Sequence, residues 1–143
     1  MTVKPHETPA SSPAAGPARS PGTVVLLWVA KLLAAGILGY AAFLKLLSHQ
    51  AEIDLFTQLG WEPHGRYLIG GLEILAALML IVPQSTIYGA FLGLGVMLGA
   101  IIGHLTAFQL AGIQFALLVA AACVTVLYIR RNDAEFIRNL WDR

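Results

Sequence analysis

Four titratable side chains lie inside the long apolar runs of this sequence: Lys31, Lys45, Glu73 and His104. A charged group within hydrocarbon is costly unless it has a partner, an aqueous cavity or a route to the interface. Lys31 lies about two turns into the first run, so its long stem can carry the ammonium toward lipid head groups, and we predict no functional role for it. Lys45, Glu73 and His104 are therefore the candidates for chemistry.

These three residues belong to three different apolar runs but are predicted to lie at one depth. Consecutive spans alternate in direction, with Lys45 near the end of the first, Glu73 about 10 Å along the second and His104 about 7 Å before the end of the third. A carboxylate, an ammonium and an imidazole in one layer can satisfy one another. Two interpretations stay open: an ion pair that only fixes helix packing, or a pocket that binds the polar head of a quinone or another lipid.

The sequence offers little for catalysis by the chain alone. Its single cysteine, Cys123, excludes an intrachain disulfide, a dithiol relay and a Cys-rich zinc site, and we expect this thiol to be inert. We predict no catalytic residue and no metal site, and we find no cofactor-binding motif. The formal net charge of +1 gives no indication of nucleic acid as a partner.

The elements that must position these side chains are membrane spans. Of the 143 residues, 57% are hydrophobic and only 12% charged, whereas a soluble domain has about a quarter charged. Apolar runs cover residues 24–47 and 67–82, and a third run of about 43 residues is roughly twice the length of one span. This run must fold back near residues 107–114, which gives spans at 87–108 and 110–129. The predicted fold is an all-α, transmembrane four-helix bundle in a lipid bilayer.

A short helix is predicted between the first and second spans, within residues 48–66. Ile53, Phe56 and Leu59 recur at helical spacing with polar residues between them, followed by Gly60 as a stop and Trp61. This pattern is typical of a helix that lies in the membrane interface, although an ordinary polar loop is the alternative.

The two ends of the chain differ in composition from the spans. Residues 1–22 carry a proline at every fourth position from Pro5 to Pro21, and we expect a disordered tail. Residues 23–130 form the membrane domain, and residues 131–143 form a charged tail. Because the flanks on the side of the termini hold most of the Lys and Arg, both tails are predicted to be cytoplasmic, in the cell (inner) membrane.

Glycines recur at helical spacing in the third span. Gly95, Gly99 and Gly103 form a GxxxGxxxG pattern, and Gly89 and Gly93 precede them. Small residues let another backbone come close, so packing within the bundle and a homo-oligomer both stay open. We also expect Gly99 and Gly103 to leave room beside the imidazole on this span.

The stretch from about residue 32 to residue 108, about half of the chain, resembles the DoxX-like family of small four-helix membrane proteins. The resemblance rests on four motifs in order: Phe43-Leu44-Lys45-Leu46, Leu59-Gly60-Trp61-Glu62-Pro63, Ile69-Gly70-Gly71-Leu72-Glu73 and Gly103-His104-Leu105. It places the typical polar positions of the family at Lys45, Glu73 and His104.

The resemblance also implies a class of function. Members resemble the small membrane subunits of thiosulfate:quinone oxidoreductases, or look like components of other membrane oxidoreductase assemblies. The expectation is an accessory or ligand-binding subunit of a quinone-linked redox assembly, with a quinone as the candidate ligand. Other members look like receptor-assembly chaperones in animals, so the alternative is a non-redox assembly factor or a binder of another lipophile.

Overall fold

The computed structural model describes residues 19–107 and 110–131, so the predicted tails fall largely outside the described residues. Four of its helices are long and apolar enough to cross a bilayer, and a short helix lies between the first two of them. This confirms the predicted all-α fold with four spans. The helices are α1 (Pro21–Leu46), α2 (Gln50–Gln58), α3 (His64–Ile81), α4 (Thr86–Thr106) and α5 (Ile113–Arg130).

The first helix begins earlier than the hydrophobicity indicates. Proline suits the first turn of a helix, where its missing N–H is not needed, and Pro21 takes this position. The side chain of Ser20 caps the helix by accepting a hydrogen bond from the backbone N–H of Thr23. The helix therefore starts three residues before the apolar run at Val24, and residues 21 and 22, which the sequence analysis assigned to the tail, are helical.

The turn between α3 and α4 is held by its own side chains and by two cations. Val82 is extended because Pro83 follows it, and the hydroxyl of Thr86 donates to the carbonyl of Val82 at 2.9 Å. Nζ of Lys31 donates to the last carbonyl of α3 at 3.3 Å, and Arg130 donates to that of Pro83 at 2.6 Å. Lys31 is 3% exposed, and its ammonium ties α1 to this turn.

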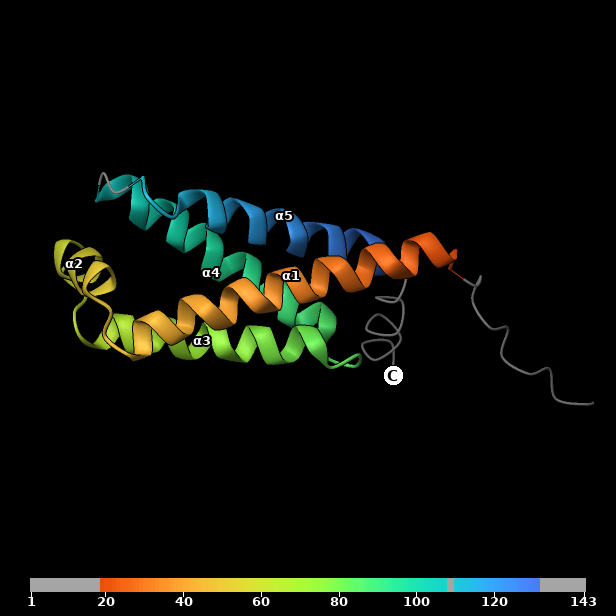
Figure 1. The fold of residues 1–143 in the computed structure, drawn as a ribbon, viewed down its shortest axis with the longest axis horizontal. Coiled ribbons are helices and arrows are strands. Elements are labelled where there is room, and N and C mark those ends of the chain that lie inside the picture. Colours follow the sequence, from red (N-terminus) through yellow and green to blue (C-terminus); the bar gives the residue numbers. More distant parts are fainter. Residues whose placement is uncertain (1–18, 108–109, 132–143) are drawn as a thin grey trace, which may run out of the picture.

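The four long helices form two antiparallel pairs (Figure 1). α1 packs on α3 and α5, and α4 packs on the same two helices. The α4–α5 pair diverges from the α1–α3 pair toward the end that carries α2, as Figure 1 shows. We call this end of the bundle the α2 end, and the end with residues 19 and 131 the opposite end.

The bundle buries small side chains and exposes large apolar ones, which is the reverse of the usual arrangement in a soluble protein. Buried core positions are rich in small residues, whereas large apolar side chains point outward. Close helix contact through small residues and an apolar outer surface are what a lipid environment favours. Examples of the buried small residues are Ala30, Ala34, Ala76, Ala90 and Ala122, and examples of the exposed large ones are Leu32, Leu78, Phe91, Ile102 and Leu117.

The glycines of α4 divide between two faces. A Cβ at Gly89 would stand 2.6 Å from a backbone nitrogen of α3, and one at Gly93 would stand 3.1 Å from Sγ of Cys123. A Cβ at Gly95 or Gly99 would have no atom within 4 Å. The first two glycines therefore serve packing inside the bundle, and the other two leave an open apolar face.

Candidate functional site

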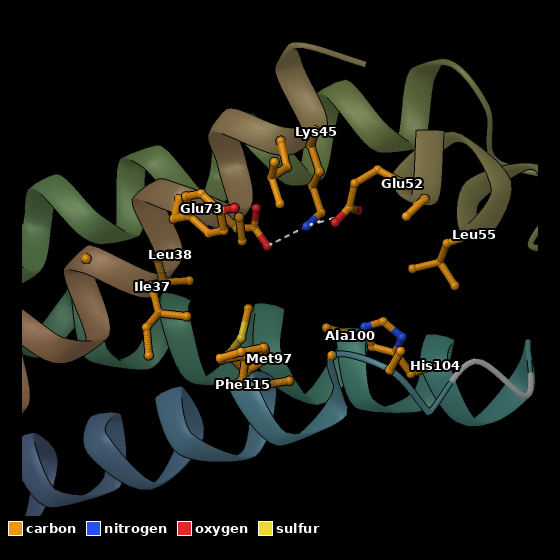
Figure 2. A pocket seen from close by; sticks show the side chains of 18 residues that line it. Ile37, Leu38, Lys45, Glu52, Leu55, Glu73, Met97, Ala100, His104 and Phe115 are labelled. Atoms are coloured by element: carbon orange, nitrogen blue, oxygen red, sulfur yellow. Dashed lines mark ion pairs between the residues drawn. The ribbon is translucent and has the colours of Figure 1, made fainter. Parts of the chain in front are cut away.

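A cavity of about 470 Å³ lies at the α2 end of the bundle (Figure 2). α1 supplies the largest share of its walls, α4 and α5 supply further lining residues, α2 contributes Ala51, Glu52 and Leu55, and Glu73 lines it from α3. Lining residues at one edge are exposed, including Tyr40 of α1 at 64% and Phe115 of α5 at 54%. The cavity therefore opens sideways between α1 and α5, and its volume falls in the range of about 300–1,000 Å³ common for small-molecule sites.

Three charged side chains meet at the inner side of this cavity. Nζ of Lys45 lies 3.1 Å from Oε1 of Glu73 and 3.4 Å from Oε2 of Glu52. The side chains of Lys45 and Glu73 are 10% and 1% exposed, so the pair is shielded from solvent. One ammonium thus faces two carboxylates, and we call these three residues the acidic triad.

Two carboxylate oxygens of the acidic triad are buried without a hydrogen-bond partner among the described residues. Oε2 of Glu73 is buried and has no hydrogen-bond partner among the residues that the structure describes. Oε2 of Glu52 is also buried, and its contact with Lys45 is an ion pair without hydrogen-bond geometry. The triad therefore keeps spare acceptor capacity beside the cavity.

His104 lies on the other side of the cavity from the triad. Figure 2 shows it on α4 with Met97 and Ala100, facing the space across from Lys45 and the two glutamates. A Cβ at Gly112 would stand 3.4 Å from Cε1 of His104, and Gly112 has a φ of 99°, which favours glycine. The loop before α5 therefore packs closely on the imidazole edge.

The space beside His104 does not come from the glycines that the sequence indicated. A Cβ at Gly103 would stand 3.3 Å from the side chain of Leu59, and Gly99 faces outward. Neither glycine lines the cavity, whereas Ala100 and Gly112 do. The prediction about Gly99 and Gly103 is wrong because these residues lie on other faces of α4 than the cavity side.

Arg66 holds the segment that carries Lys45. Its guanidinium donates from Nη1 to the backbone carbonyl of Lys45, and from Nε to both carboxylate oxygens of Glu62, at 3.0 and 2.9 Å. The sequence analysis does not single out Arg66, which the structure shows to be 2% exposed. The hydrogen bond from Arg66 is the main reason why the pKa of Glu62 lies below its ordinary value.

Gly70 is a second residue that places Lys45. A Cβ at Gly70 would stand 3.3 Å from Cβ of Lys45, so α3 approaches α1 closely beside the ammonium-bearing residue. One turn further along α3 the chain presents Glu73, and this geometry brings the carboxylate to the ammonium. Arg66, Gly70 and Glu73 thus act along one side of α3.

Glu52 is the site residue that the sequence analysis missed. The sequence predicts Ile53, Phe56 and Leu59 as the apolar side of the short helix and gives Glu52 no role. In the structure Leu55 and Phe56 are buried, and Glu52 lies on the same side of α2. A signal was available, because Glu52, Leu55, Phe56 and Leu59 follow the i, i+3, i+4, i+7 spacing of one helix face.

Metal binding and thiol chemistry have less support among the described residues. Within residues 19–107 and 110–131, no group of three His, Cys, Asp or Glu side chains could hold a metal ion. Cys123 is a free, buried thiol that packs in the core and does not line the cavity. The arrangement is an apolar cavity with three charged side chains gathered at one side.

Comparison with known proteins identifies the family. Residues 29–126 match the sequence model of the DoxX-like family, and this range contains the acidic triad and His104. No curated protein and no solved structure matches this chain significantly. Because the family match covers more than half of the chain, and four helices can span a bilayer, this multi-pass membrane protein belongs to the DoxX-like family.

Proposed function

We propose that this protein binds the polar head of a lipophilic ligand in its cavity and acts as an accessory subunit of a membrane redox assembly. The observation that supports the proposal is a largely apolar cavity with charged groups gathered at its inner side. A quinone is the first candidate ligand. It has a compact polar head, an apolar tail and a redox function that matches the membrane assemblies which relatives of this family resemble.

The proposed binding mode follows from the opening between α1 and α5. The head group lies between the acidic triad and His104, and the tail leaves past Tyr40 and Phe115 into the bilayer. An imidazole can donate a hydrogen bond to one head-group oxygen, and the triad meets the opposite edge of the ring. This chain binds and orients the ligand, and the partner subunit carries the electron-transfer centre.

The test is the quinone content per protein after purification in mild detergent. Wild type should retain quinone, and His104→Ala and Glu73→Gln should lose most of it while staying folded in the membrane. His64→Ala is the matched control, because His64 is exposed and does not line the cavity. Equal quinone content in all four proteins, or no more than in an unrelated four-helix membrane protein, would contradict the proposal.

The alternative function is a non-redox assembly factor, and the open face of α4 supports it. A partner helix could approach closely at Gly95 and Gly99, where a Cβ would meet no atom within 4 Å. Under this alternative, Gly99→Leu should abolish copurification of a partner subunit, or of a second copy of this chain, without changing bound lipid. Mass spectrometry of copurifying proteins and of extracted lipids separates the two functions.

The proposed orientation places both termini in the cytoplasm and the cavity in the outer half of the cell (inner) membrane. The positive charge near the termini supports it. Single cysteines at Ser12 and Asp142, in a Cys123→Ser background, should be protected from an impermeant thiol reagent in intact cells. A cysteine at the exposed Gln58 should be labelled. Labelling of the two termini instead of Gln58 would reverse the orientation.

A further inference from the structure

We infer that the cavity selects a head group that donates hydrogen bonds, so that it holds a quinol in preference to the corresponding quinone. This inference rests on the proposed function and specifies its ligand. It comes from the hydrogen-bonding groups around the cavity, because the acidic triad presents more acceptor oxygens than donor N–H groups.

The two carboxylates of the triad present four acceptor oxygens, and Nζ of Lys45 offers three N–H groups. This ammonium lies between Glu73 Oε1 and Glu52 Oε2, at 3.1 and 3.4 Å. Oε2 of Glu73 is buried without a hydrogen-bond partner among the described residues, on a side chain that is 1% exposed. A buried polar atom of this kind is unfavourable until a donor reaches it.

A quinone and a quinol differ in what they offer this oxygen. A quinone carbonyl is an acceptor only, so placing it beside Glu73 brings two acceptors together and leaves the carboxylate oxygen unsatisfied. A quinol hydroxyl is a donor, and a bond from O–H to a carboxylate is charge-assisted and strong. A quinone would need Lys45 as its donor, in competition with the two carboxylates that already pair with it.

His104 does not discriminate in the same way. A neutral imidazole has one donor and one acceptor nitrogen, so it can serve a carbonyl or a hydroxyl on the far edge of the ring. Selection therefore depends on the triad side of the cavity, and removal of His104 should weaken both ligands. This difference separates the role of Glu73 from that of His104.

The experiment measures binding of decylubiquinol and decylubiquinone to the purified full-length protein in detergent, under anaerobic conditions, by isothermal titration calorimetry. Wild type should bind the quinol at least about tenfold more tightly, because sites built to pair with a hydroxyl reject analogues that lack it. A quinol with both hydroxyls methylated should bind no better than the quinone. This third ligand shows whether the donors, and not the ring shape, carry the preference.

Variants test the residue assignment. Glu73→Gln replaces a carboxylate oxygen by an NH₂ donor and should reduce the quinol preference to about twofold or less, mainly by weakening the quinol. Glu52→Gln provides the same test from α2 if the first variant does not fold. Asp54→Asn is the matched control and should keep the full preference, because Asp54 is exposed and accepts a hydrogen bond from Gln50 at 2.8 Å.

The outcomes separate this inference from the proposed function. Equal binding of the two ligands, or tighter binding of the quinone, would overturn the quinol preference while leaving a quinone-type site in place. Equal preference in wild type and in both glutamate variants would also overturn the inference. No binding of any of the three ligands would refute the proposed function itself.

Discussion

Replacing Lys45 by methionine should destabilise the bundle more than replacing Glu73 by glutamine, because the ammonium serves two carboxylates. At 3.1 and 3.4 Å, each ion pair has a Coulomb attraction of about 5 kcal/mol at an effective dielectric constant of about 20. Lys45→Met leaves the buried Glu73 and the partly buried Glu52 without their shared cation, and loss of one partner of a buried pair costs about 3–5 kcal/mol. Glu73→Gln leaves Lys45 paired with Glu52, so its cost is nearer to about 1.5–3 kcal/mol.

A double-mutant cycle tests this reasoning. The free energy of unfolding is measured by titrating detergent-solubilised protein with sodium dodecyl sulfate, for wild type, Lys45→Met, Glu73→Gln and the double variant. The double variant should lose at least about 1 kcal/mol less than the sum of the single losses, because residues in contact couple. The cycle of Lys45→Met with Asp54→Asn is the control and should be additive.

Two results would refute the claim that Lys45 pairs with both glutamates of the acidic triad. Additivity within about 0.5 kcal/mol for Lys45 and Glu73 would mean that they do not interact in the folded protein. A larger loss for Glu73→Gln than for Lys45→Met would mean that Glu52 does not share the ammonium. In that case the pair would be an isolated ion pair.

Four further variants test other features of the bundle. Gly89→Ala should destabilise the bundle by about 1–3 kcal/mol, since its Cβ would stand 2.6 Å from a backbone nitrogen of α3. Gly99→Ala should be neutral or slightly stabilising. The melting temperatures of both variants in detergent test this difference. Cys123→Ala should keep quinone retention and cost less than about 2 kcal/mol, and loss of retention at normal folding would assign the thiol a function. The pKa of Glu62 is lowered by Arg66 from an ordinary value of 4.5, so this pair stabilises the fold above that pH and loses its effect as the pH falls through the lowered pKa. Wild type should therefore melt above Glu62→Gln at about pH 6, and the gap between the two melting temperatures should close as the pH falls below 4.5. A constant gap would contradict this origin.

The sequence alone predicts the number of spans and the depth of the polar groups. Span count depends on the length of apolar runs relative to the bilayer, which is a property of local composition. Depth follows from the rise per residue and the alternation of direction, so Lys45, Glu73 and His104 could be assigned to one layer. The structure brings all three to one cavity at the α2 end.

The direction in which each side chain points could not be predicted in this way. The spans are apolar on every side, so hydrophobic periodicity does not reveal which face turns inward. Gly89 and Gly93 pack inside the bundle while Gly95 and Gly99 do not, although all four belong to one glycine-rich pattern. Only the packing of α4 against α3 and α5 distinguishes them.

Tertiary structure also decided the composition of the site. Glu52 and Arg66 lie outside the apolar cores of the spans, where charge is ordinarily solvated, and sequence analysis assigned neither to the site. α2 packs beside the end of α1 and brings Glu52 to Lys45. The start of α3 brings Arg66 to the last turn of α1. These contacts join residues of different helices. A buried charge needs a partner, but only the three-dimensional arrangement determines which partner comes within reach.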